Sequence, residues 1–335
     1  RADASGGQAA SRPQRRAGGR GETPAAERHG PAVAYRADMD AVPGDAGPAH
    51  LCGHDVHTAI GVGVGQVLAR LRDRFSGRVM LVFQPAEETL EGARAMIASG
   101  VLEPVAPQEF YALHSAPLPV GEFAVMPGFG LPGLDTGHID LSGPDAVEHA
   151  RRLKATIDGW ATVPYPQNPE DIARMLHDSL TPDGPLSRFV VGGGVLEPRP
   201  QGTRVRFWFK AWPDERYHEL RDDIRRLAGS VDGARVEFAP EPFPAMVCSP
   251  SLSEAAAAYM RGVPGLGPVT VLHASFPFNG EDFALFLRHV PGAMFYLGVG
   301  VDGMPHSPGF AADDRAIGVG VRTMTGLLLD RLHKL

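Results

Sequence analysis

The stretch Cys52–His57, which reads CGHDVH, places a thiol, two imidazoles and a carboxylate within six residues. Thiolate, imidazole and carboxylate groups are the usual protein ligands of zinc and related divalent ions. The run Arg36–Asp40 (RADMD) precedes this stretch, and the run Gln84–Glu88 (QPAEE) follows it. Few other chemistries need a Cys-x-His motif close to a pair of adjacent glutamates. The sequence therefore predicts a metallohydrolase.

The composition is that of a globular protein with more than one domain. The chain has 335 residues, of which 43% are hydrophobic and 21% charged, and this length favours two domains. A membrane span needs about 20 mostly apolar residues in a row, and the sequence has no such run. The net charge of -7 argues against a nucleic-acid partner. We therefore expect a small-molecule substrate, with no nucleic-acid or membrane partner.

The two cysteines and the N-terminal segment bear on the location of the protein. Cys52 and Cys248 are few enough to fit a reducing compartment, so we expect a cytoplasmic protein. The pair Arg15-Arg16 is followed by no apolar segment, which argues against export. Cys248 is interpreted as a buried apolar residue. Residues 1–30 are predicted to be a disordered tail or a segment added to the natural chain.

Apolar runs that end at polar residues indicate an α/β sheet with a site at one edge. The run 79–83 leads to Glu87 and Glu88, and the run 110–113 ends at His114. Open α/β sheets hold their sites at the carboxyl ends of the strands. The first strand is predicted over 32–35, and further elements of this domain are predicted as helices over 57–74, 92–99, 252–261, 283–289 and 316–332 and a strand over 293–297.

The pattern changes between residues 137 and 245, where helices alternate with neighbouring strands. Helices are predicted over 148–160, 171–180 and 215–227, and strands over 139–141, 188–191, 203–212 and 234–238. This order favours an α+β domain with one helical layer, inserted into a discontinuous catalytic domain of residues 31–136 and 246–335. Two glycine runs are assigned to structure. Gly61–Gly65 is interpreted as a small-residue helix face, and Gly192–Gly194 as a flexible bend or strand end.

Six motifs together resemble the M20 family of two-metal peptidases, and within it the amidohydrolase branch that includes hippurate hydrolase and indoleacetyl-amino-acid hydrolases. They occur in the family's order, in a resemblance that extends from residue 31 to the C-terminus. The motifs are Arg36–Pro43, Cys52–Ala59, Gln84–Glu88, Leu113–His114, Gly280–Phe283 and Pro305–Pro308. The resemblance implies a zinc-peptidase-like α/β domain, with a mixed sheet flanked by helices and an inserted, ferredoxin-like α+β lid domain.

The resemblance also implies a site with two divalent metal ions per subunit. Zinc or manganese is favoured over the alternatives, cobalt and nickel. Glu87 would be the general base for a metal-bound hydroxide, and Cys52 would bridge the ions. Asp40 would not bind the metal itself but would orient a ligand imidazole. The implied metal ligands are Cys52, His54, Glu88, His114 and His306.

Other polar residues are assigned to structure or to substrate binding. His57 is interpreted as structural, and Glu281-Asp282 as a helix N-terminus. The inserted domain lacks the Gly-Gly-His of the family, and Lys210 and Glu197 stand where the resemblance implies a substrate-binding Arg and Asn. Seven other histidines are interpreted as ordinary polar residues: His29, His50, His149, His177, His218, His273 and His289.

The sequence thus predicts a metal-dependent amidohydrolase that cleaves the amide bond of a small N-acyl amino acid or a related conjugate. A dipeptidase or carboxypeptidase on the same scaffold is an alternative function. A catalytically silent ligand-binding protein is an alternative of a different class. The resemblance further raises the expectation of a homodimer formed through the inserted domain.

Overall fold

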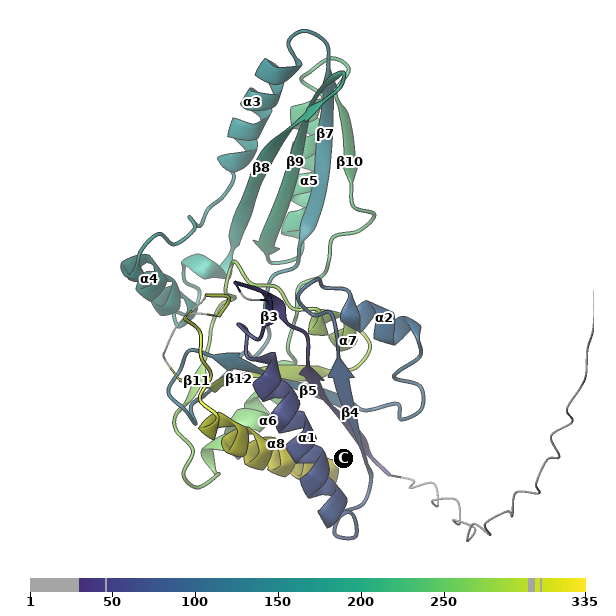
Figure 1. Ribbon diagram of the computed structural model, residues 1–335, viewed down its shortest axis with the longest axis vertical. Helices are drawn as coiled ribbons and strands as arrows, with labels where there is room; N and C mark the ends of the chain where they lie inside the picture. Colours follow the sequence, from purple (N-terminus) through teal and green to yellow (C-terminus); the bar gives the residue numbers. More distant parts are fainter. Residues whose placement is uncertain (1–29, 46, 301–304, 308) are drawn as a thin grey trace, which may run out of the picture.

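The computed structural model describes residues 30–45, 47–300, 305–307 and 309–335 of the chain. The tail predicted for residues 1–30 therefore lies outside the described residues, apart from Gly30. The described strands form a six-stranded sheet, a four-stranded sheet and a short two-stranded hairpin. In Figure 1 the four-stranded sheet stands above the six-stranded sheet, and the chain passes from the larger sheet to the smaller one and back.

The six-stranded sheet is mixed, with the strand order β11-β6-β12-β5-β1-β4. Its neighbouring strands run parallel except β12 and β6, which run antiparallel. The central strands β1 and β12 are buried along their whole length, as strands with helices on both faces usually are. The strands are β1 (Ala32–Asp38), β4 (Arg78–Gln84), β5 (Glu109–Ala116), β6 (Phe123–Val125), β11 (Val269–Val271) and β12 (Gly292–Gly298).

Helices cover both faces of this sheet, which confirms the predicted mixed sheet flanked by helices. Helices α1 (His54–Leu71), α6 (Pro250–Arg261) and α8 (Arg315–Lys334) lie on one face, and α2 (Gly92–Ala98) and α7 (Phe283–Leu287) on the other. The hairpin strands are β2 (Val42–Gly44) and β3 (Gly47–Ala49). Of the described helices, none combines the length and the apolar character needed to cross a membrane.

The glycines of α1 allow close packing, as the small-residue interpretation predicts. A Cβ atom at Gly61 would lie 2.9 Å from Phe83 of β4, and one at Gly65 would lie 2.8 Å from Leu81. Gly63 instead faces α8, where a Cβ atom would lie 2.4 Å from Val321. The helix is therefore held close to both the sheet and α8.

The inserted domain has the ferredoxin-like arrangement that the resemblance implies. Its antiparallel sheet has the order β10-β7-β9-β8, and helices α3 and α5 pack on one face of it around a common core. Helix α4 (Pro169–Ser179) and the 3₁₀ helix η1 (Pro185–Ser187) lie between α3 and β8. The other elements are β7 (Asp135–Ser142), α3 (Ala146–Asp158), β8 (Phe189–Arg199), β9 (Gly202–Trp212), α5 (Arg216–Ala228) and β10 (Arg235–Phe238).

Three local predictions were wrong. Gly192–Gly194 is neither a bend nor a strand end, because β8 continues through it to Arg199 and pairs with β9. Gly192 has a φ of 152°, and a Cβ atom there would lie 2.2 Å from the carbonyl oxygen of Trp208, so the strand requires glycine. Helix α1 begins at His54 rather than His57. His114 lies within β5 rather than after it.

Candidate metal centre

The five residues predicted as metal ligands meet at one edge of the six-stranded sheet. Strands β1, β4 and β5 are parallel, so their carboxyl ends lie side by side. His114 lies near the end of β5, and Glu88 lies in the loop after β4. Cys52 and His54 come from the start of α1, which packs on β1 and β5. His306 reaches the same place from the loop after β12, within 3.3 Å of Glu88.

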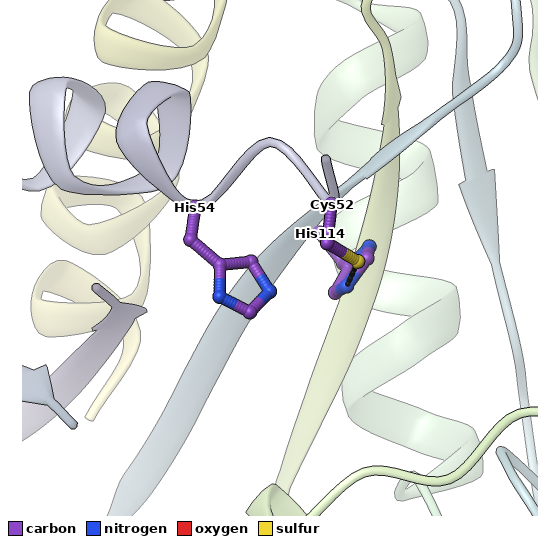
Figure 2. A group of neighbouring side chains, drawn as sticks. All are labelled: Cys52, His54 and His114. Atoms are coloured by element: carbon purple, nitrogen blue, oxygen red, sulfur yellow. Dashed lines mark hydrogen bonds between the residues drawn. The ribbon is translucent and has the colours of Figure 1, made fainter. Parts of the chain in front are cut away.

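Two groups of donor atoms share one sulfur atom. Cys52, His54 and His114 make up the first group, which Figure 2 shows. Cys52, Glu88 and His306 make up the second, and within each group all donor atoms lie within 4.8 Å of one another. Cys52 Sγ lies 3.6 Å from His114 Nε2. A thiolate placed in this way can bridge two metal ions.

Hydrogen bonds turn the Nε2 atoms of two imidazoles toward the cluster. His114 Nδ1 donates to the carbonyl oxygen of Ser115 at 2.8 Å. His54 Nδ1 lies 3.2 Å from Asp40 Oδ1, and the other Asp40 oxygen accepts the backbone N–H of Glu88 at 3.0 Å. Metal-binding histidines usually use one nitrogen in this way, which fixes the other for the ion.

Two buried atoms of the cluster have no hydrogen-bond partner among the described residues. They are His54 Nε2 and Glu88 Oε1. Buried polar atoms are normally satisfied, and an exception calls for an explanation such as an ion. Together with the mixed set of sulfur, nitrogen and oxygen donors, these atoms fit a site for divalent metal ions.

His57 is placed as the structural interpretation predicts. The backbone N–H of Ser115 donates to His57 Nε2 at 2.7 Å, so this nitrogen acts as an acceptor. His57 Nδ1 must then carry the proton, which it donates to Asp38 at 2.5 Å. Because both ring nitrogens are engaged, His57 has no free lone pair for a metal ion.

The pKa values in the cluster reflect burial and crowded negative charge. Burial raises the pKa of the Cys52 thiol, and burial also raises the pKa of Glu87, with Glu281 adding to that rise. Burial lowers the pKa of His114 to about 3. Burial also acts to lower the pKa of His54, but its hydrogen bond to Asp40 and nearby carboxylates raise it to about 9. A bound cation would offset this negative charge and favour the thiolate and carboxylate forms.

A buried ion network behind the cluster was missed in the sequence. The Arg36 guanidinium, which is fully buried, contacts Glu281 at 2.9 and 3.2 Å and Asp38 at 2.9 Å. Arg36 also donates to Gln84 at 3.0 Å, and Asp282 accepts a hydrogen bond from Gln84. Glu281 and Asp282 do precede α7 as predicted, but they also neutralise Arg36. An arginine followed two residues later by an aspartate, at the end of an otherwise apolar strand, was the signal available for this network.

Glu87 is held beside the donor cluster by an unusual turn. Ala86 adopts a φ of 55°, a left-handed conformation that residues other than glycine rarely take. Its carbonyl oxygen accepts the backbone N–H groups of Glu91 and Gly92, which stabilises the turn. Glu87 is 5% exposed, and its Oε2 atom lies 4.0 Å from His54 Nε2. The base predicted from the sequence therefore borders the cluster.

The two candidate substrate-binding residues are placed differently. Lys210 of β9 reaches the catalytic domain, where its Nζ would lie 3.0 Å from a Cβ atom at Gly280. Burial lowers the pKa of Lys210 to about 8, although the charge of Glu87 acts in the opposite sense. Glu197 pairs instead with Arg206 at 3.0 Å near the β8–β9 turn. Its strand partner is Arg204, six residues or about 20 Å along β9 from Lys210, so the structure does not bring Glu197 to the cluster.

Residues 34–330 match peptidase family M20/M25/M40. The chain belongs to this family. An N-acetylcysteine deacetylase of Bacillus subtilis (strain 168) is 30% identical over 315 residues, which cover 87% of this chain and 79% of that protein. An N-acetyldiaminopimelate deacetylase of Shouchella clausii is 28% identical over 320 residues, which cover 88% of this chain and 82% of that protein.

Solved structures of the M20 family share the fold. The YXEP protein of Bacillus subtilis, described as a dinuclear metal binding peptidase from the M20 family, has a TM-score of 0.72 and 25% identity. The match covers 92% of this chain and 83% of that one. The α/β fold with its inserted domain is confirmed, and so is the assignment to metal-dependent amidohydrolases.

Proposed function

We propose that this M20 family member hydrolyses the amide bond of small N-acyl amino acids with two divalent metal ions. The observation that carries the proposal is the pair of donor groups that share Cys52 Sγ. Cys52, His54 and His114 would hold one ion, and Cys52, Glu88 and His306 the other. Zinc or manganese fits this donor set, since thiolate and imidazole suit zinc and carboxylate also suits manganese.

Bound divalent ions would polarise the scissile carbonyl and acidify a water molecule. Glu87 would accept a proton from the attacking water while the new C–O bond forms. It would then pass this proton to the amine nitrogen as the C–N bond breaks. The place of Glu87 at the rim of the cluster, with its carboxylate 4.0 Å from His54, supports this role.

Lys210 would hold the carboxylate of the amino-acid part of the substrate. It enters from the inserted domain and lies over Gly280, on the side of the cluster where Glu87 lies. An ammonium group acts as a single point charge, whereas a guanidinium makes a two-point contact with a carboxylate. We therefore propose a substrate with one carboxylate near the scissile bond. Lys210 would bind this carboxylate by charge attraction rather than by a two-point contact.

The substitution Glu87→Gln tests the proposal. It should leave the metal content unchanged, because Glu87 is not among the proposed ligands, and lower turnover by about 10²–10⁴-fold. The assays are elemental analysis and hydrolysis of N-acetylcysteine, N-acetyldiaminopimelate and benzoylglycine. The matched control Glu88→Gln should instead lower the metal content. A Glu87→Gln protein with a nearly normal rate would assign the proton transfer to another group.

The same assays separate the alternative functions. Faster hydrolysis of dipeptides than of acyl amino acids would favour a dipeptidase or carboxypeptidase. A fully metal-loaded protein that hydrolyses no amide in a broad panel would favour a silent binding protein. A homodimer through the inserted domain and a cytoplasmic location stay predictions from the sequence.

A further inference from the structure

Tyr296 is a buried side chain beside the cluster that the proposed function does not use. It lies in β12 directly opposite His114 of β5 in the register of the parallel pair. Paired residues of neighbouring strands point to the same face of a sheet. The Tyr296 ring accordingly packs edge-on against the rings of His114 and Phe276, with 6.0 Å between the centroids in each pair.

The Tyr296 hydroxyl has no hydrogen-bond partner among the described residues, although the residue is only 6% exposed. Such a hydroxyl is costly to the free protein unless a partner arrives. A phenol keeps its proton near neutral pH, so this hydroxyl is a hydrogen-bond donor that has no acceptor in the part of the chain that the structure describes. The ring contact with His114 places Tyr296 beside the residues proposed to carry out hydrolysis.

We infer that the Tyr296 hydroxyl donates a hydrogen bond to the acyl oxygen of the bound substrate. The inference rests on the proposed function. When water adds to the acyl carbon, negative charge develops on this oxygen, and the charge leaves it again as the C–N bond breaks. Tyr296 acts only as a hydrogen-bond donor, so it transfers no proton and forms no covalent bond. A fixed donor in a site closed to water lowers the energy of this charged intermediate more than that of the substrate.

Another buried tyrosine provides a matched control. The Tyr35 hydroxyl also lacks a hydrogen-bond partner among the residues that the structure describes. Tyr35 pairs with Tyr111 of β5, three residues before His114, so it lies on the opposite face of the sheet. There Tyr111 donates to Glu109, which also binds Arg331 of α8. Removing the Tyr35 hydroxyl alters the same kind of buried atom on the face away from the proposed acyl site.

The test compares Tyr296→Phe and Tyr35→Phe in the metal-loaded protein, with acetate as the probe. Acetate carries the oxygens that the acyl group has after deacetylation, and its binding is measured by the shift in melting temperature. Tyr296→Phe should weaken acetate binding about tenfold or more, as the loss of one hydrogen bond to a charged group does. It should also lower kcat/KM by about 10²-fold, with unchanged metal content. Tyr35→Phe should change neither quantity.

The stability of the Tyr296→Phe protein gives a second readout. A purely structural role of the Tyr296 hydroxyl would predict a lower urea midpoint, whereas the proposed role does not. Because Tyr296→Phe removes an unpaired buried hydroxyl, its urea midpoint should equal or exceed that of the wild type. Unchanged acetate affinity, or a clear fall in the urea midpoint, would overturn the inference. A wild-type protein without turnover would refute the proposed function alone, since acetate binding by the two proteins can still be compared.

Discussion

Arg36 carries a charge at a position in β1 that water does not reach. Its guanidinium is matched by Glu281 and Asp38, and Gln84 accepts its remaining Nε–H. Burial alone would raise the pKa of Asp38, but Arg36 and His57 outweigh burial and hold it well below its usual range. The three charged groups therefore depend on one another, because a lone buried charge has neither water nor a partner.

Replacing Arg36 should be among the most damaging changes outside the proposed metal ligands. Arg36→Met leaves Glu281 and Asp38 without their guanidinium partner, and we expect a loss of about 3–5 kcal/mol in the free energy of unfolding. Urea denaturation followed by tryptophan fluorescence measures this loss. Arg204 also makes a two-point contact with a carboxylate, that of Asp140, but on the surface of the inserted domain. Arg204→Met should hardly change the midpoint, and equal losses would show that burial is not the cause.

Residues of the site could be predicted from the sequence where they lie together in a short motif, but not where they come together only in the folded sheet. Cys52, His54 and Glu88 lie in short motifs from which the sequence alone predicts a metal site. Arg36 and Glu281 are 245 residues apart. No feature of the sequence near either residue indicates that the two form an ion pair. The sequence offered no means of seeing that Tyr296 would lie beside His114 without a hydrogen-bond partner. Such contacts depend on strand register, which forms only when the whole sheet assembles.

At the scale of elements, the contact between α1 and α8 shows how small residues set a packing distance. Gly63 of α1 faces Val321 of α8. A Cβ atom added to Gly320 of α8 would lie 2.4 Å from the Ile60 side chain of α1. The glycines cost helix stability, since alanine is more favourable by about 1 kcal/mol in a helix interior. Their presence is explained by the closeness of the two helices. The N-terminus of α1 carries Cys52 and His54, so this packing also positions the proposed ligands.

A pair of glycine substitutions separates helix propensity from packing. Gly63→Ala should destabilise the protein by about 1–3 kcal/mol, because the new methyl group meets Val321 and overpacking outweighs the gain in propensity. Gly318→Ala in α8 should stabilise it by about 0.5–1 kcal/mol, since a Cβ atom there meets nothing within 4 Å. Thermal unfolding measures both effects. The double variant Gly63→Ala/Val321→Ala should recover part of the loss, and no recovery would argue against a steric cause.

The elements that sequence could predict were those with a strong pattern of their own. The apolar runs of β1, β4 and β12 and the periodic pattern of α8 led to nearly correct bounds. The three-residue strands β6 and β11 were missed, because their extended form depends on pairing with each other and with β12. The continuation of β8 beyond Val191 was missed for a similar reason, since eleven register pairs with β9 hold its glycines extended.

At the scale of the whole molecule, the segment around α4 joins the inserted domain to the catalytic domain. Figure 1 shows α4 beside the junction of the two sheets. A hydrophobic cluster includes Leu186 and Phe189 of the inserted domain and Ala274 and Phe278 of the catalytic domain. The backbone N–H of His273 also donates to Ser179, the last residue of α4, at 2.7 Å. The loop that makes these contacts continues directly to Glu281, so α4 is linked to the network behind the donor cluster.

A substitution that weakens the contacts at this junction should increase local opening there without affecting the six-stranded sheet. Phe278 contacts Tyr165 with 5.0 Å between ring centroids and is partly buried, so Phe278→Ala should cost about 1–2 kcal/mol locally. Amide hydrogen exchange across 162–187 and 273–278 should then become about tenfold faster, while β1, β5 and β12 keep their protection. Leu176→Ala, at an exposed position of α4, is the control and should change neither region. Faster exchange throughout the molecule would mean that Phe278 supports global stability, and the proposed junction would have to be abandoned.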